Sequence, residues 1–176
     1  MEKYQITYRE AIPEDAYEIT LLRKIWFTTY VNKEEGITKE DIESSHNSRT
    51  IEEETARRAE RIENNKESKI WVAKNQDKVV GFVEVQKKEK RNRIGAFYIL
   101  DEYQHKGIGT ELMKKALGWL GTKKDIFCEV ATYNKGAIAF YKKFGFEDNG
   151  ATTNDVAKLP SGKIIPEIEM VLKNTL

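Results

Sequence analysis

Two glycines two residues apart, Gly107 and Gly109, separate an apolar run from an amphipathic pattern and constrain the fold more than any other feature. The apolar run over residues 93–100 predicts a strand, and the apolar spacing over residues 107–121 predicts a helix. Glycines at the start of a helix leave backbone N–H groups uncovered, and the helix dipole favours an anion beside them. The stretch therefore predicts a pyrophosphate-binding turn, with close packing of helix on strand as the alternative reason for the glycines.

The charge balance excludes some classes of partner. The 30 Lys and Arg residues nearly cancel the 29 Asp and Glu residues, so a net charge of +1 gives no general attraction to nucleic acid or membranes. The single cysteine, Cys128, and two distant histidines form neither a disulfide nor a metal-ligand cluster, so we expect no metal site. Because no apolar window is long enough for a signal or a membrane span, we expect one cytoplasmic domain, residues 1–176, acting alone or as a homodimer.

Periodicity and turn residues predict the order of the elements. Strands are expected over residues 4–11, 69–74, 79–86, 93–100, 126–131, 147–155 and 164–173. Helices are expected over residues 13–30, 51–65, 107–121 and 134–145, with a short helix starting at residues 38–41. Short turns between the second, third and fourth strands indicate antiparallel neighbours, and the helix after the fourth indicates a parallel crossover to the fifth. The sequence thus predicts an α/β fold with helices packed on a mixed sheet.

An acidic window covers residues 32–67, with eleven acidic and seven basic side chains. The helix within it, residues 51–65, has a thin apolar face, which predicts a position on the surface. One interpretation is a solvated helical face. The other is an acidic lid that favours a cationic substrate.

Two motifs, taken together, resemble those of the GNAT N-acetyltransferase superfamily. Residues 104–109 fit its acyl-CoA-binding pattern Gln/Arg-x-x-Gly-x-Gly/Ala, and residues 134–146 fit its second pattern, Asn-x-x-Ala-x-x-Phe-Tyr-x-x-x-Gly-Phe. One helix and one strand separate them, as the superfamily requires. The resemblance implies a GNAT-like, mostly antiparallel central sheet of about seven strands with helices on both faces. It also implies acetyl-CoA as cofactor and coenzyme A as product.

The ending over residues 160–170 is most similar to that of small bacterial and archaeal spermidine/spermine N-acetyltransferases. This closer resemblance implies a small-molecule amine as substrate, with a cationic polyamine as the first expectation. The choice of acceptor is expected to lie in residues 25–50 and in the final hairpin.

The resemblance also assigns cofactor-binding roles. The end of the fourth strand would splay from its neighbour and pair with the pantetheine arm, and the glycine turn would bind the pyrophosphate. Asn134 would hold the cofactor arm or a water as well as cap its helix, and Lys143 would reach the cofactor. The residues implied in these roles are Phe97, Tyr98, Ile99, Gln104, His105, Lys106, Gly107, Ile108, Gly109, Thr110, Asn134 and Lys143.

Acetyl transfer to an amine requires a proton for the leaving thiolate and removal of a proton from the amine. The resemblance makes Tyr141 the general acid, with a plain core aromatic as the alternative. Glu84, on the strand beside the cofactor strand, is the candidate base; it could instead face the surface, and the amine could lose its proton through water without a dedicated base. His105 occupies a variable motif position and is expected to face phosphates or solvent.

Three functions remain open from the sequence. The first is acetylation of a small amine, and the second is acetylation of a protein α-amine or lysine. The third is a non-catalytic acyl-CoA-binding regulatory module, against which the presence of Tyr141 argues. A dinucleotide-binding domain requires a third glycine that the turn lacks. A narrow acidic pocket would favour the first function, and a wide open groove the second.

Overall fold

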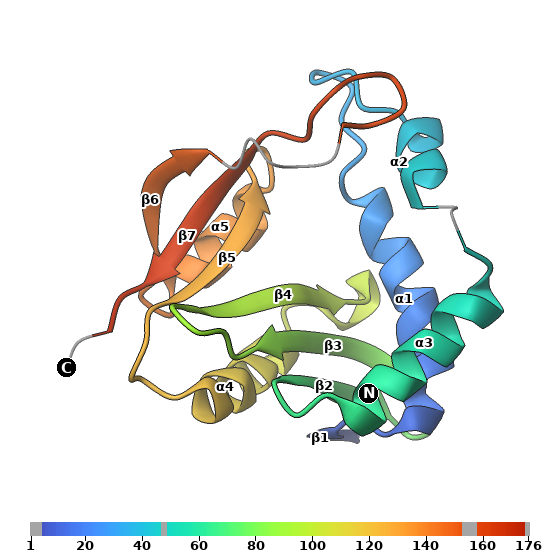
Figure 1. Cartoon of the computed structure of the whole chain (residues 1–176), viewed down its shortest axis with the longest axis vertical. Coiled ribbons are helices and arrows are strands. Elements are labelled where there is room, and N and C mark those ends of the chain that lie inside the picture. The colour runs from blue at the N-terminus through green and yellow to red at the C-terminus, as the bar shows by residue number, and fades with distance from the viewer. Residues whose placement is uncertain (1–4, 47–48, 153–157, 175–176) are drawn as a thin grey trace.

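A seven-stranded sheet with the order β1-β2-β3-β4-β5-β7-β6 organises the chain in the computed structural model, which describes residues 5–46, 49–152 and 158–174 (Figure 1). The strands are β1 (Ile6–Glu10), β2 (Ser68–Asn75), β3 (Lys78–Gln86), β4 (Asn92–Ile99), β5 (Ile126–Ala131), β6 (Glu147–Thr152) and β7 (Glu167–Leu172). The helices are α1 (Ala16–Thr28), α2 (Lys39–His46), α3 (Ile51–Asn64), α4 (Ile108–Leu120) and α5 (Lys135–Lys142), with two short 3-10 helices, η1 (Pro13–Asp15) and η2 (Asp101–Tyr103).

The pairing of the strands confirms the predicted fold class. Strands β1 to β4 are antiparallel neighbours, β5 runs parallel to β4, and β7 pairs antiparallel with both β5 and β6. The last strand begins at Glu167 rather than at residue 164, because Pro166 before it has no N–H to donate to a ladder. The predicted strand over residues 147–155 is observed to Thr152, and its last three residues lie outside the described ranges.

Helices cover both faces of the sheet. Helix α4 packs on β1 to β4, while α1 and α3 pack against β2, β3 and each other (Figure 1). The side chains of β3 from Val79 to Val85 are all buried, which requires cover on both faces because successive side chains point to opposite sides. Within the described ranges, no helix combines the length and the apolar character needed to cross a membrane.

A second, smaller hydrophobic cluster lies apart from the main core. It contains five buried side chains, those of Ile37, Ile42, Ala131, Leu159 and Ile165. Two hydrogen bonds add to it: the Ser161 backbone N–H donates to Asp41 (3.2 Å), and Lys163 Nζ donates to the Gly36 carbonyl (2.7 Å). The segment between α1 and α2 is thereby fixed to the segment that precedes β7, and the two lie side by side (Figure 1).

Asp15 fixes the start of α1 to the edge of the sheet. Its carboxylate accepts hydrogen bonds from Arg9 of β1 (2.6 and 2.8 Å) and from the Ile12 backbone N–H (2.9 Å). Burial alone would raise the pKa of Asp15, but these hydrogen bonds and the charges of Arg9 and Lys74 outweigh it and lower the pKa. A lowered folded-state pKa contributes stability that is present above the unfolded value and is lost as the pH falls.

Replacing this carboxylate should destabilise the fold. We expect Asp15→Asn to lower the free energy of unfolding by about 2 kcal/mol, because Arg9 and Lys74 lose the buried negative charge that they share. The wild-type advantage should begin to shrink as the pH falls below about 4, where the unfolded aspartate takes up a proton, and should be lost once the folded aspartate is protonated as well. Urea unfolding at pH 7 and at acid pH measures both effects. Glu14→Gln, which changes the exposed neighbouring acid, is the control; an equal loss there would contradict the role of Asp15.

Candidate active site

Strands β4 and β5 separate soon after they begin. The described ladder between them contains two pairs, Asn92 with Ile126 and Arg93 with Phe127. Gly95 is an extra residue in β4, because Ile94 pairs with Val85 whereas Ala96 pairs with Glu84. Such a bulge bends its strand, and Figure 1 shows β5 turning away from β4. The β4 edge from Gly95 onward, with Phe97, Tyr98 and Ile99, is thus left open on the β5 side.

The glycine turn adjoins the open edge. Gly107 is the N-cap of α4 in a left-handed conformation (φ 82°), and no side chain caps the helix there. A Cβ at this position would meet no heavy atom within 4 Å, so the space in front of the helix is open. His105 also has a positive φ (59°), and the loop from Gln104 to Gly107 is exposed. The turn therefore directs the first-turn N–H groups of α4 into open space, as a phosphate-binding turn requires.

Gly109 joins the two sequence motifs in space. A Cβ built on it would lie 3.1 Å from the Phe140 ring of α5 and 3.2 Å from the Ile99 side chain of β4. The rings of Phe97 and Phe140 are also in edge contact, with centroids 5.3 Å apart. The turn, the open edge of β4 and helix α5 therefore meet at this point, and Gly109 allows their close approach.

Three predicted cofactor residues also have structural roles. The Gln104 side chain donates to the Ile99 carbonyl (3.2 Å) and to Asp101 (2.9 Å), so it holds the loop against the end of β4. The side chains of Ile108 and Tyr98 are buried in the main core, which leaves their backbone groups for a cofactor. Thr110 is exposed in the first turn of α4.

Helix α5 begins as predicted. Asn134 is its N-cap, with Oδ1 accepting from the Ala137 backbone N–H at 3.0 Å. Lys143 is exposed at the end of the helix, and Gly145 follows with a positive φ (85°), as expected of a helix-ending glycine.

Tyr141 lies on the buried side of α5. Its ring contacts Phe140 and Phe146, and its hydroxyl is hydrogen-bonded to the Cys128 thiol of β5. Burial raises the pKa of Tyr141 well above its usual value, and the nearby charges and the Cys128 hydrogen bond act in the same direction. The phenol therefore stays protonated at physiological pH. The thiol is a weak hydrogen-bond acceptor, so the hydroxyl can turn from it to a stronger one.

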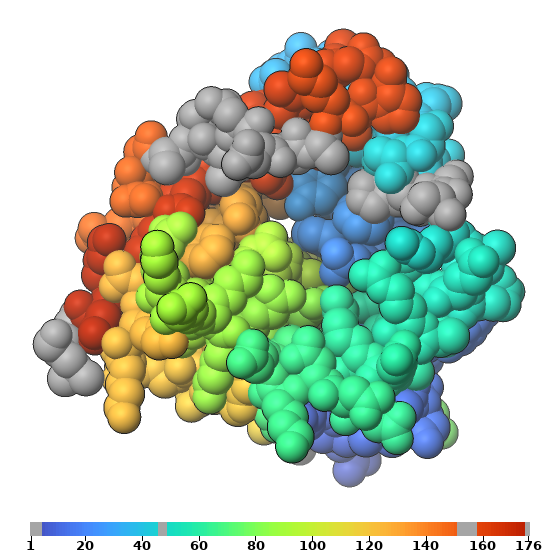
Figure 2. Space-filling model, in the orientation of Figure 1, coloured from blue at the N-terminus to red at the C-terminus, as the bar shows by residue number. Residues whose placement is uncertain are grey.

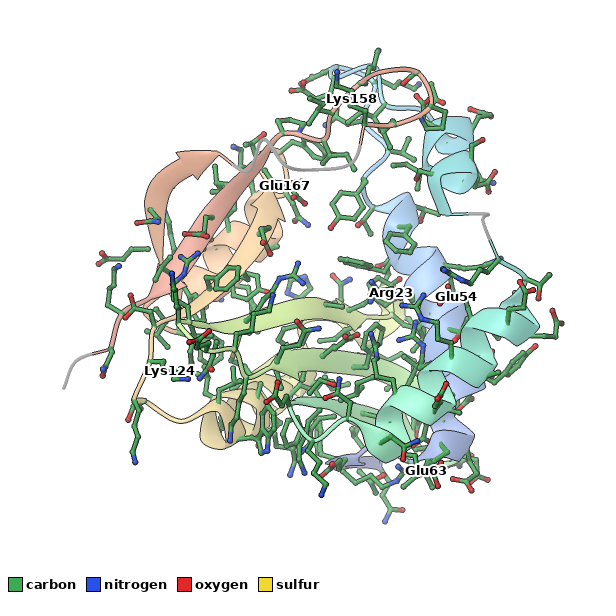
Figure 3. The ribbon with its side chains drawn as sticks, in the orientation of Figure 1. Arg23, Glu54, Glu63, Lys124, Lys158 and Glu167 are labelled. Atoms are coloured by element: carbon green, nitrogen blue, oxygen red, sulfur yellow. The ribbon has the colours of Figure 1, made fainter. Side chains whose placement is uncertain are left out.

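A cleft of about 540 Å³ lies on the other side of the strand split. Arg93 and Gly95 of β4 and Glu129 of β5 form one side of it. Figure 2 shows the hollow between the yellow-green strands and the blue helix α1. Arg23 of α1 and Glu54 of α3 lie across the opening from Glu167 of β7 (Figure 3). The cleft therefore reaches the point where β4 and β5 part.

Glu84 is a buried group of the cleft, and the surface-facing alternative is therefore wrong. Its Oε2 lies 3.1 Å from Arg61, 3.5 Å from Arg23 and 3.9 Å from Arg58. One carboxylate thus faces three guanidinium groups. No pattern in the sequence predicts this cluster, because its members come from α1, α3 and β3.

The acidic window does not form an acidic lid. Four arginines of residues 32–67 line the cleft, namely Arg49, Arg57, Arg58 and Arg61. Among the described lining residues, Glu54 is the one acid that comes from this window. Helix α3 lies on the surface as predicted, but Arg58 on its inner side is buried. The helix is therefore asymmetric in charge, with most of its acids exposed and its arginines lining the cleft, and composition alone could not separate its faces.

Two tyrosines connect the segment after α1 with the segment after β5, and Tyr30 of this pair lines the cleft. The Tyr133 hydroxyl donates to the Tyr30 carbonyl at 2.8 Å, and both side chains pack on the small hydrophobic cluster. Burial, followed by the charges of Glu167 and Glu35, raises the pKa of Tyr133 to about 12. The sequence did not single out either tyrosine, although Tyr30 belongs to the segment expected to choose the acceptor.

The residues present fit coenzyme A. The open β4 edge offers backbone groups to an extended arm, and the uncapped start of α4 offers N–H donors to phosphates. No group of three or more His, Cys, Asp or Glu side chains in the described part of the chain is placed to hold a metal ion.

Comparison with known proteins agrees with this geometry. The family model described as the acetyltransferase (GNAT) family matches residues 35–146. An uncharacterized N-acetyltransferase of Methanocaldococcus jannaschii is 34% identical over 91 residues, a match that covers 47% of this chain and 40% of that protein. The chain therefore spans less than half of that relative.

Solved structures share the whole fold. PaiA N-acetyltransferase of Thermoplasma acidophilum, in complex with coenzyme A, is 22% identical with a TM-score of 0.69, covering 96% of this chain and 99% of that one. The ribosomal-protein-S18-alanine N-acetyltransferase of Escherichia coli is 14% identical with a TM-score of 0.66, covering 98% and 96%.

Proposed function

Because this chain belongs to the acetyltransferase (GNAT) family, we propose that it transfers an acetyl group from acetyl-CoA to a primary amine. The observation that carries the proposal is the split between β4 and β5, which connects the glycine turn with the cleft. A donor held on one side of the sheet and an acceptor on the other would meet at this split.

In this proposal the cofactor residues predicted from the sequence bind different parts of acetyl-CoA. The open edge of β4, from Phe97 to Ile99, pairs with the extended arm, and the N–H groups between His105 and Thr110 bind the pyrophosphate. Lys106 adds positive charge, and Asn134 and Lys143 lie on α5 at the other side of the arm. Gln104 acts through its hydrogen bond to Ile99, so it is a positioning residue.

Tyr141 is the proposed general acid. Bound acetyl-CoA supplies a thioester carbon to which the amine nitrogen bonds while the carbon–sulfur bond breaks. The Tyr141 hydroxyl gives its proton to the leaving sulfur and recovers one from water afterwards. Its raised pKa keeps this proton in place until the thiolate forms.

The amine also loses a proton. Glu129 and Glu167 line the cleft on its β5 and β7 side, and we propose that a water between the amine and these carboxylates carries the proton away. Glu84, the candidate base from the sequence, faces three guanidinium groups instead. We propose that it positions these arginines.

The charge and size of the cleft also bear on which class of amine is the acceptor. A polyamine is the expectation from the closer sequence resemblance, but an arginine-rich cleft is unfavourable for a polycation. The cleft matches neither the narrow acidic pocket expected for a polyamine nor the wide open groove expected for a protein. A small primary amine is the candidate that its volume favours.

The release of free thiol from acetyl-CoA tests the proposed function. We expect release that depends on enzyme and amine, in a panel of polyamines, amino acids, amino sugars and peptides, together with a product one acetyl group heavier by mass spectrometry. Coenzyme A binding without release for any amine would contradict the proposal and favour a non-catalytic binding module.

A further inference from the structure

The cleft carries more positive than negative charge. Among the described residues, seven basic side chains and four acidic ones line it, an excess of three positive charges in a chain whose net charge is +1. Salt bridges account for part of the set: Arg49 and Arg57 lie 3.0 and 3.7 Å from Glu54, and Arg93 lies 3.0 Å from Glu129. The excess is concentrated where Arg23, Arg58 and Arg61 share Glu84.

This arginine cluster, Arg23, Arg58 and Arg61, has too few acceptors. Arg58 is 5% exposed, and its Nε donates to Thr20 at 3.1 Å. Its Nη1 is buried without a hydrogen-bond partner, and the Glu84 oxygen 3.9 Å away is beyond hydrogen-bond distance. A buried guanidinium without full compensation is costly. Burial, followed by the charge of Arg23, lowers the pKa of Arg58 to about 10, which reflects the same shortage of negative charge.

The cluster is accessible from the cleft. Arg23 and Arg61, with side chains 30% and 31% exposed, share the Glu84 carboxylate with the buried Arg58, and all three line the cleft. An anion between Arg23 and Arg61 would accept charge-assisted hydrogen bonds and would offset the excess charge around Arg58. Arginine suits this task because its planar fork matches carboxylate and phosphate oxygens.

We propose that the arginine cluster binds an anionic group of the acceptor, so that the substrate is a small amine bearing a carboxylate or a phosphate. The proposal rests on the acetyltransferase function proposed above. The amine would lie at the strand split, beside Glu129 and Gly95, and the anionic group would lie under α1 and α3. The cleft joins these two ends.

Acceptors matched in length test the proposal. For each carbon-chain length, the kcat/KM values of an ω-amino acid, an aminoalkyl phosphate, an α,ω-diamine and an uncharged alkylamine are compared. We expect an anionic amine to exceed the diamine of equal length by about 10-fold or more, the effect of a charge-assisted hydrogen bond. The carboxylate and phosphate series distinguish the two anions. Diamines that equal or exceed both anionic series would overturn the proposal, and so would a preference for acidic peptides over every small anionic amine.

Direct binding provides a readout that does not depend on turnover. Inorganic phosphate and the preferred anionic amine should raise the melting temperature of the wild-type protein in the presence of coenzyme A. Arg61→Gln and Arg23→Gln, both partly exposed positions, should each weaken this binding by about 10-fold. Arg91→Gln is the control, because Arg91 pairs with Glu169 outside the cleft.

The two proposals fail in different ways. Anion binding that is weakened in the Arg61 and Arg23 variants, without acetylation of any amine, supports the arginine site and contradicts the acetyltransferase function. Acetylation of diamines, with no anion binding or with equal binding in all variants, contradicts the arginine site and leaves the acetyltransferase function standing.

Discussion

Tyr141→Phe should lower kcat by about 100-fold while the affinity for acetyl-CoA changes little, because a positioned general acid contributes about this much. The substitution removes one oxygen atom and keeps the ring contacts with Phe140 and Phe146. The substitution also removes the hydrogen bond between the Tyr141 hydroxyl and the Cys128 thiol. Because a thiol is a weak acceptor, this loss costs little stability and the fold should be retained. Single-turnover kinetics with a saturating amine, together with titration of coenzyme A, separate the chemical step from binding.

A matched control distinguishes this role from a general effect of losing a phenol. Tyr8→Phe removes a hydroxyl on β1, at a position that does not line the cleft, and should leave kcat unchanged. The pH profile gives a second check: since burial raises the pKa of Tyr141, deprotonation of this phenol should not lower kcat up to about pH 10. An unchanged kcat in Tyr141→Phe would remove the residue from the mechanism.

Gly109→Asp should weaken coenzyme A binding by about 100-fold. The new Cβ would press on Phe140 and Ile99, and the carboxylate would lie beside the start of α4, where the cofactor phosphates are expected. Two like charges a few ångströms apart repel by about 1 kcal/mol or more even with strong screening. Titration of coenzyme A at low and high salt measures the loss and its electrostatic share, since salt weakens the repulsion.

Two further variants separate charge from crowding. Asparagine has nearly the shape of aspartate without its charge. The Gly109→Asn variant should therefore bind coenzyme A about 10-fold more tightly than the Gly109→Asp variant. Gly118→Asp places the same carboxylate on the same helix, at an exposed position with no heavy atom within 4 Å of its Cβ, and should not change affinity. Equal affinities in the Asp and Asn variants would place the phosphates elsewhere.

Local signals in the sequence predicted most of the fold. Asn134 as a cap and Gly145 as a helix end act within a few residues of their own positions, and their roles were confirmed. The split between β4 and β5 was expected from the resemblance to a family rather than from periodicity, because it depends on where a parallel ladder ends.

The acceptor side was not predicted because it is assembled from distant segments. Arg23 and Arg58 are ordinary surface residues by pattern, and Glu84 was expected only as a candidate base. Their convergence depends on how α3 packs against α1. The net acidity of residues 32–67 left two interpretations open, a solvated helical face and an acidic lid for a cationic substrate. A sum over a window does not record which side of a helix each charge occupies, so it could not decide between them. The structure assigns the arginines to the cleft and most of the acids to solvent.

The small cluster around Ile37 and Leu159 has a consequence for how such proteins diverge. It stabilises the segments beside the acceptor cleft, yet its described members include neither the glycine turn nor Tyr141. Substitutions there affect few buried side chains, so they should cost less stability than substitutions in the main core. Under the proposed function, substitutions in these segments should change the acceptor preference and leave the residues proposed to bind the donor in place, which is one route by which such proteins can diverge.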